Sequence, residues 1–214
     1  MVNASLPFAT LSGVAIARLI VISGPSGAGK GTLIRYALPK LEGPVLSVSA
    51  TTRPPRAGER HGCDYFFLTE DEFRQWVADG RFLEWAEYAG HLYGTPREPV
   101  QRALDSGHDV ILEIELKGAD QILKQCPRAA IVFIVPPSLE ELEKRLRRRS
   151  TENEVAIQRR LNRAKEELAE VARRMSEGRP RGHYVIVNDE IERAGEELLR
   201  VLREIHRDDE QADN

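Results

Sequence analysis

The chain has 214 residues, of which 41% are hydrophobic and 30% are charged, an ordinary composition for a globular protein with one well-formed core. Its formal net charge of −3 gives no overall attraction to nucleic acid or to a membrane surface, and we expect neither as a partner. The two cysteines, Cys63 and Cys126, form no cluster of metal ligands, which favours free thiols and a cytoplasmic protein.

The two ends of the chain differ in composition from the rest. Residues 1–17 carry no charged side chain, and we expect a poorly ordered leader there. A faint cleavage-site pattern at 14–17 leaves export open as an alternative, although a secretory signal needs basic residues before its apolar region. Residues 207–214 are polar and acidic, and we expect a frayed tail.

Apolar, β-branched runs alternate with helical patterns along most of the chain. This alternation predicts an α/β fold with a parallel five-stranded core and helices on both faces. The core strands are expected at 19–22, 45–49, 110–115, 130–135 and 184–187. The helices are expected at 32–38, 96–107, 138–149, 153–175 and 191–205.

Between residues 51 and 95 the pattern changes. Residues 51–64 are rich in proline, glycine and arginine, which predicts a loop. After it we expect a short strand at 65–68, a helix at 69–79 that begins with a capping box, and two strands between 82 and 93. The sequence therefore predicts a mixed α/β insertion at 51–95 within a core formed by 18–50 and 96–206.

Residues 24–30 read Gly-Pro-Ser-Gly-Ala-Gly-Lys between the first strand and the first helix. In this context the pattern predicts a phosphate-binding loop, because glycines let backbone N–H groups curl around phosphate oxygens and the helix N-terminus adds a positive dipole. Lys30 supplies a cation for the outer phosphates. Gly31 stands where a serine or threonine usually contacts Mg²⁺, so we expect the nucleotide itself to carry the ion. A glycine-rich structural turn is the alternative interpretation.

Arg53 and Arg56 flank two prolines shortly after the second expected strand. Arginine forks suit bidentate contacts with phosphate, and this position favours a second phosphate site. A solvated loop is the alternative.

Glu84 and the segment Tyr93-Gly94-Thr95 suit a guanine base. A carboxylate can accept hydrogen bonds from both the ring N–H and the exocyclic amino group of guanine, whereas adenine offers no matching pair of donors. Thr95 can add a hydroxyl contact. The alternative is an ordinary strand-surface glutamate beside a core tyrosine.

Two further groups of charged residues lie later in the chain. Glu113 and Glu115 end one expected strand, where their side chains would share a face, one orienting hydrated Mg²⁺ and the other facing the acceptor; ordinary charged residues at a strand end are the alternative. The second group is the basic run 144–149 with Arg159, Arg160 and Arg163 on the next expected helix, which would place cations over a migrating phosphoryl group. A basic run is more often a solvated face, and nucleic-acid binding is a further alternative.

In this order the segments resemble guanylate kinase over about residues 18–206. The resemblance rests on GPSGAGKGT (24–32), SVSATTRPPRAGE (47–59), DYFF (64–67), FLEWAEYAGHLYGT (82–95), ILEIELKGAD (111–120), PPSLEELEKRL (136–146) and VIVND (185–189). It implies a P-loop NTPase-type kinase with a GMP-binding region and a helical lid at about 138–175. The implied reaction transfers the γ-phosphoryl group of ATP to GMP, or to dGMP, with Mg²⁺, in purine nucleotide metabolism.

The resemblance also implies a role for each matching residue. The implied GMP ligands are Ser49, Arg53, Arg56, Tyr65, Glu84, Tyr93, Thr95 and Glu115. The implied ATP contacts are Gly24, Pro25, Ser26, Gly27, Ala28, Gly29, Lys30, Gly31, Thr32 and Asn188. The implied catalytic residues are Lys30, Arg53, Arg145, Arg149 and Arg160. Independently of the resemblance, we expect Glu113 at the strand end to reach Mg²⁺ through water.

The chain departs from the family pattern at several positions. The family often has aspartate at Glu113 and Glu115, glutamine at Lys117 and glycine at Ser150, and the stretch 175–182 is longer than usual. Two other functions stay open: a related scaffold that binds peptides without turnover, and a kinase of the same fold that acts on another phosphorylated acceptor.

Overall fold

The computed structural model describes residues 17–148, 154–177 and 182–207. Its centre is a five-stranded sheet in the order β2-β7-β1-β8-β9, in which every pairing is parallel. The strands are β1 (Leu19–Ser23), β2 (Val45–Leu46), β7 (Val110–Glu113), β8 (Ala130–Val135) and β9 (His183–Val187). The predicted parallel five-stranded core is confirmed.

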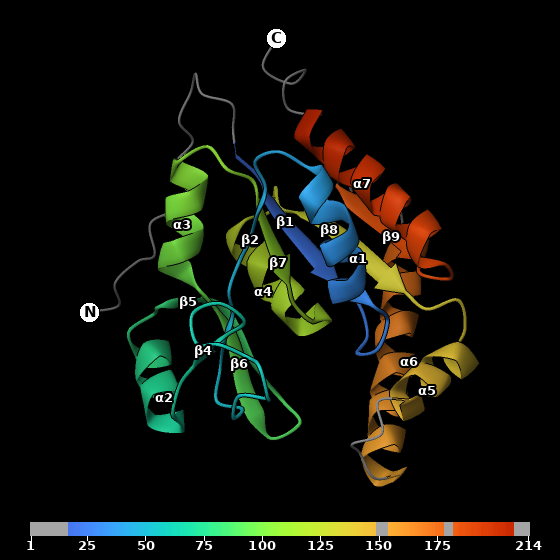
Figure 1. Cartoon of the computed structure of the whole chain (residues 1–214), viewed down its shortest axis with the longest axis horizontal. Coiled ribbons are helices and arrows are strands. Elements are labelled where there is room, and N and C mark those ends of the chain that lie inside the picture. The colour runs from blue at the N-terminus through green and yellow to red at the C-terminus, as the bar shows by residue number, and fades with distance from the viewer. Residues whose placement is uncertain (1–16, 149–153, 178–181, 208–214) are drawn as a thin grey trace.

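Helices cover both faces of this sheet (Figure 1). Successive residues of a strand point to opposite sides, and here the side chains on both sides are apolar. Ile20 and Ile22 of β1 pack on one side with α1 (Lys30–Ala37) and α7 (Ile191–Arg207). Leu19 and Val21 pack on the other side with α3 (Arg97–Asp105) and α4 (Leu116–Gln125). A 3-10 turn, η1 (Leu38–Lys40), follows α1.

A second, mixed sheet has the order β4-β3-β6-β5. Its strands are β3 (Ala50–Thr51), β4 (Phe66–Phe67), β5 (Phe82–Tyr88) and β6 (His91–Pro96), and α2 (Glu70–Ala78) packs on it. The capping box predicted at Thr69 is present, with hydrogen bonds in both directions between Thr69 and Glu72. The small core between this sheet and α2 includes Phe73 stacked on Phe82. In Figure 1 this sheet lies below the core sheet at the left.

Two helices at the lower right of Figure 1, α5 (Leu139–Arg148) and α6 (Glu154–Ser176), have a small apolar core of their own. The buried members of this core are Leu142, Leu146, Ile157, Leu161 and Ala164. No helix in the described ranges is both long and apolar enough to cross a membrane.

Two predicted strands are shorter than expected. The strand predicted at 45–49 ends its core pairing at Leu46, and the chain then crosses to the second sheet, where Ala50 pairs with Gly94 and Phe66. The strand predicted at 110–115 ends at Glu113, because Glu115 is already the N-cap of α4. Helix α4 itself was not predicted.

Candidate active site

The phosphate loop connects β1 to α1 and is folded by its glycines. Gly24, Gly27 and Gly29 all have positive φ angles, of 141°, 91° and 94°. A Cβ on Gly24 would lie 2.0 Å from the carbonyl oxygen of Ile134, so no larger residue fits there. Lys30 Nζ donates to the carbonyl oxygen of Gly24 at 2.6 Å, which holds the ammonium group over the loop. The first turn of α1 has neither a side-chain cap nor an acidic residue, which suits an anion.

Asn188 and Arg145 hold this loop in place through hydrogen bonds. Asn188 is buried, donates from Nδ2 to the carbonyl oxygen of Ala28 (2.6 Å), and would collide with any Cβ on Gly29. Arg145 on α5 donates to the Asn188 carbonyl oxygen (2.9 Å). Gly27 lies against side chains of the same helix. The expected ATP contact Asn188 and the expected catalytic Arg145 therefore meet beneath the loop.

Gly31 and Glu113 lie together at the carboxyl end of the core sheet. A Cβ on Gly31 would be 3.2 Å from one carboxylate oxygen of Glu113 and 3.3 Å from the other. Burial, and secondarily the charge of Glu113, raise the pKa of the Tyr65 phenol. The expected Mg²⁺ residue therefore lies beside the first turn of α1, with Tyr65 within range of its charge.

The carboxylate of Glu59 organises the loop after β3 that carries Arg53 and Arg56. Arg53 Nη2 lies 2.9 Å from both carboxylate oxygens of Glu59, and Glu59 also accepts from the backbone N–H of Arg56. The Arg53 guanidinium is 5.4 Å from the ring of Tyr65, which is 6.3 Å from the ring of Tyr93. Arg53, Tyr65 and Tyr93 are thus neighbours, as a shared phosphate ligand requires.

Glu84 is the most perturbed carboxyl of the second sheet. It is 5% exposed, and Thr95 donates to its Oε1 at 2.7 Å. Burial raises the pKa of Glu84 to about 7, and the nearby charge of Glu115 adds to this rise. A buried carboxyl with a single neutral partner is costly to ionise, so this arrangement suits a ligand that brings donors.

Helix α6 reaches both sheets through arginines. Arg160 donates from Nη2 to Ser26 of the phosphate loop (2.6 Å) and from Nε to the Tyr88 hydroxyl of β5 (3.0 Å). Arg163 donates to Glu115 at 2.5 Å, and its guanidinium lies 4.7 Å from the ring of Tyr88. Burial raises the pKa of Glu115, while the charge of Arg163 opposes that rise.

The predicted site residues that the structure describes fall into two regions: the carboxyl ends of the core strands with the phosphate loop and the arginines of α5 and α6, and the second sheet with the loop after β3. Ser49 is half-buried beside β3 and Arg56 is exposed, whereas Arg149 lies outside the described residues. Sequence reasoning gave no individual role to Glu59, Tyr88 or Arg163. Only Arg163 carried a signal in the pattern, as part of the basic stretch on the predicted helix.

Known proteins share both the sequence and the fold. A family model described as guanylate kinase matches residues 16–205. A guanylate kinase of Rubrobacter xylanophilus is 53% identical over 88% of this chain and 94% of its own length. One of Synechocystis sp. is 47% identical over 87% of this chain and 94% of its own length. The crystal structure of guanylate kinase from Anaplasma phagocytophilum superposes with a TM-score of 0.68 at 31% identity, covering 89% of this chain and 86% of that one.

Proposed function

The chain belongs to the guanylate kinase family, and from that premise we propose that it transfers the γ-phosphoryl group of ATP to GMP, giving ADP and GDP. It is a nucleoside monophosphate kinase, and we expect it to accept dGMP as well. One observation supports the proposal most: the structure has a phosphate loop on the core sheet and, on a separate sheet, the buried carboxyl of Glu84, which suits a ligand with hydrogen-bond donors. Each half of the pair suits one of the two nucleotides.

On the ATP side, the phosphate loop and Lys30 bind the phosphates of the donor. Backbone N–H groups of the loop and of the first turn of α1 surround the phosphate oxygens, and the Lys30 ammonium follows the transferred group. Arg145, Arg149 and Arg160 stabilise the charge of that group, and the contact of Arg160 with Ser26 supports this role. Asn188 keeps the loop in shape and lies near the adenine.

On the GMP side, the second sheet binds the base and its phosphate separately. Glu84 accepts hydrogen bonds from the ring N–H and the amino group of guanine. Because these two donors offset the cost of burying the charge, guanine binding favours the ionised form of the Glu84 carboxylate. Arg53 binds the GMP phosphate, and the Glu59 carboxylate orients the Arg53 guanidinium for that contact. The remaining proposed ligands are Ser49, Arg56, Tyr65, Tyr93, Thr95 and Glu115.

The protein's own residues fit a Mg²⁺ ion that arrives on ATP. Within the described ranges no group of three or more His, Cys, Asp or Glu side chains could hold a metal ion. The Glu113 carboxylate lies beside Gly31, where it can accept from metal-bound water. When bound, Mg²⁺ neutralises charge on the phosphates.

Cytoplasmic function and the absence of a nucleic-acid partner complete the proposal. Both cysteines are free, as expected in a reducing compartment. The formal net charge of −3 gives no general attraction to nucleic acid.

A coupled assay of ADP release tests the function directly. The acceptors are GMP, dGMP, AMP, CMP and UMP, each with ATP and Mg²⁺. We expect GMP to be the best acceptor and dGMP a weaker one. Equal or better turnover of AMP would overturn the proposal, as would the absence of any ATP consumption, which would favour a binding scaffold.

A further inference from the structure

The outer strand of the second sheet is held by glutamine side chains of the core helix α4. Gln121 donates from Nε2 to the carbonyl oxygen of Trp85 (2.8 Å) and accepts from the Trp85 N–H through Oε1 (3.2 Å). Gln125, one turn later, donates to the carbonyl oxygen of Leu83 (2.5 Å). These side chains take the place of a neighbouring strand along the edge of β5. They hold the backbone on both sides of Glu84.

The side chain of Glu84 points toward the same helix. Thr95 holds its Oε1, and its Oε2 lies over Gly118 in the first half of α4. A Cβ on Gly118 would be 2.4 Å from that oxygen, closer than any real contact allows. Both residues are buried, so the carboxylate has little room to move aside. A glycine is needed there for the observed position of Glu84.

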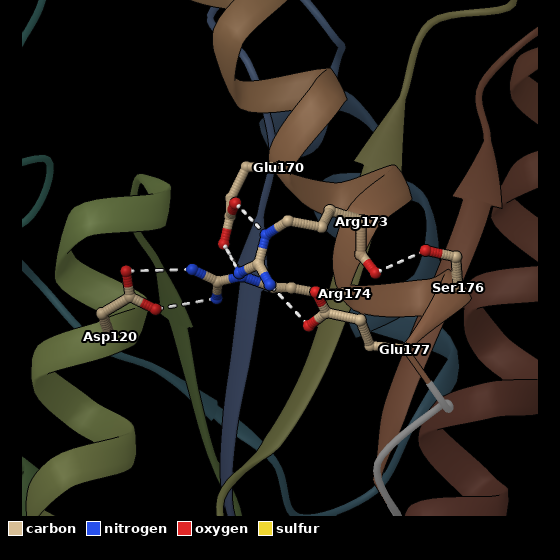
Figure 2. A network of polar contacts seen from close by, with 6 residues as sticks. All are labelled: Asp120, Glu170, Arg173, Arg174, Ser176 and Glu177. Atoms are coloured by element: carbon tan, nitrogen blue, oxygen red, sulfur yellow. Dashed lines mark hydrogen bonds and ion pairs between the residues drawn. The ribbon is translucent and has the colours of Figure 1, made fainter.

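Helix α4 is also held by α6. Figure 2 shows Arg174 of α6 contacting both carboxylate oxygens of Asp120, at 2.7 and 3.0 Å, while Glu170 accepts from its Nε. Asp120 and Gln121 are adjacent, so their side chains leave the helix in different directions. The helix is therefore fixed between α6 and the edge of β5, and can serve as a rigid support.

We propose that Gly118 and Gln121 are positioning residues for guanine selectivity. Gly118 leaves the room in which the Glu84 carboxylate faces the base, and Gln121 fixes the backbone from which Glu84 projects. Neither residue contacts the nucleotide; both act through Glu84. The inference rests on the proposed role of Glu84 as the guanine ligand.

The test compares GMP with IMP, which lacks only the exocyclic amino group. Steady-state kinetics give the ratio of kcat/KM for GMP to kcat/KM for IMP. For Gly118→Ala we expect this ratio to fall roughly tenfold or more, and for Gln121→Ala roughly threefold to tenfold. The reason is that each change displaces Glu84 and so disturbs its proposed hydrogen bond with the guanine amino group. The KM for ATP stays unchanged. Alanine is a better helix former than glycine, so α4 itself is not weakened by Gly118→Ala.

Two further variants separate positioning from general damage. Lys124→Ala changes an exposed residue of the same helix and should leave the ratio unchanged. Glu84→Asp shortens the carboxylate side chain, so adding Gly118→Ala to it should lower the ratio much less than in the wild type.

The outcomes distinguish this inference from the proposed function. If the wild type prefers GMP and both Gly118→Ala and Gln121→Ala keep the wild-type ratio, the inference is overturned and the function stands. The same holds if the two α4 variants lose activity with GMP and IMP equally. If the wild type itself does not phosphorylate GMP, the proposed function fails first.

Discussion

The phosphate loop and the second sheet are built in different ways. The loop is one continuous segment whose shape follows from positive-φ glycines and from the contact of Lys30 with the Gly24 carbonyl oxygen. The proposed guanine site instead combines residues from three separate elements: Glu84 of β5, Thr95 of β6 and Gly118 of α4. One site is made mostly of backbone, and the other mostly of side chains.

This difference determines what each region can recognise. Backbone N–H groups and a helix dipole attract any phosphate, and they carry little information about the base. A buried carboxylate requires specific donors, because an unmatched polar group in such a place is costly. Selectivity should therefore be sensitive to small changes on the second sheet, and the following changes test that expectation.

The largest effect is expected from Glu84→Gln. Glutamine offers one acceptor oxygen and one NH₂ group, so one guanine donor loses its partner. An unmatched buried group costs about 1–3 kcal/mol, which corresponds to a rise of roughly fivefold to 160-fold in the KM for GMP. The KM for ATP should hold. Steady-state kinetics with GMP and AMP check this, and an unchanged preference for GMP over AMP would remove Glu84 from the base site.

The next effect is the pH dependence of GMP binding. Burial raises the pKa of Glu84 to about 7, and only the ionised carboxylate can accept from both guanine donors. GMP affinity should therefore fall about tenfold between pH 8 and pH 6, as the free carboxyl gains its proton. Titration calorimetry at several pH values measures this.

The control for that titration is Glu84→Gln, which cannot ionise at this position. The variant retains the pH dependence of the other groups at the site, among them Glu115, whose pKa burial also raises, and of the GMP phosphate, which titrates near pH 6 in phosphomonoesters. Identical slopes for wild type and variant would show that Glu84 does not control binding between pH 6 and pH 8.

Glu113→Ala and Glu115→Ala should separate metal dependence from acceptor binding. Glu113 lies beside Gly31, so its loss should raise the Mg²⁺ concentration needed for half-maximal rate several-fold and lower turnover, with GMP binding little changed. Glu115 is close enough to raise the pKa of Glu84, and its loss should weaken GMP binding. Rate measurements across a Mg²⁺ series decide this, and exchanged phenotypes would refute the assignment.

The smallest effect is expected from Tyr88→Phe, which tests a link between the two regions. The change removes the hydroxyl that accepts from Arg160 and keeps the ring beside Arg163. We expect kcat to fall about twofold to fivefold, with the KM for GMP unchanged. Tyr36→Phe, which removes a hydroxyl bonded to Glu196, is the matched control. Equal effects of the two changes would mean that the Tyr88 hydroxyl has no special role.

The sequence predicted the phosphate loop better than the second sheet for a physical reason. The residues of the loop are neighbours in the chain, so the strand, the glycines and the helix could be recognised in one short segment, whereas the supporting hydrogen bonds of Asn188 and Arg145 could not. The strand predicted at 110–115 was too long, because it ends at Glu113 and Glu115 is the N-cap of α4; the shared face of Glu113 and Glu115 stays a prediction. Helix α4 was missed, and with it the proposed role of Gly118, which depends on a contact with Glu84 far away in the sequence.

We propose that the two regions bind different nucleotides by independent means. Titration calorimetry of GMP, and separately of a non-hydrolysable ATP analogue, with the wild type, Lys30→Ala and Glu84→Gln tests this independence. We predict that Glu84→Gln loses GMP affinity and keeps affinity for the analogue, and that Lys30→Ala does the reverse. Loss of affinity for both nucleotides in either variant would contradict the claim.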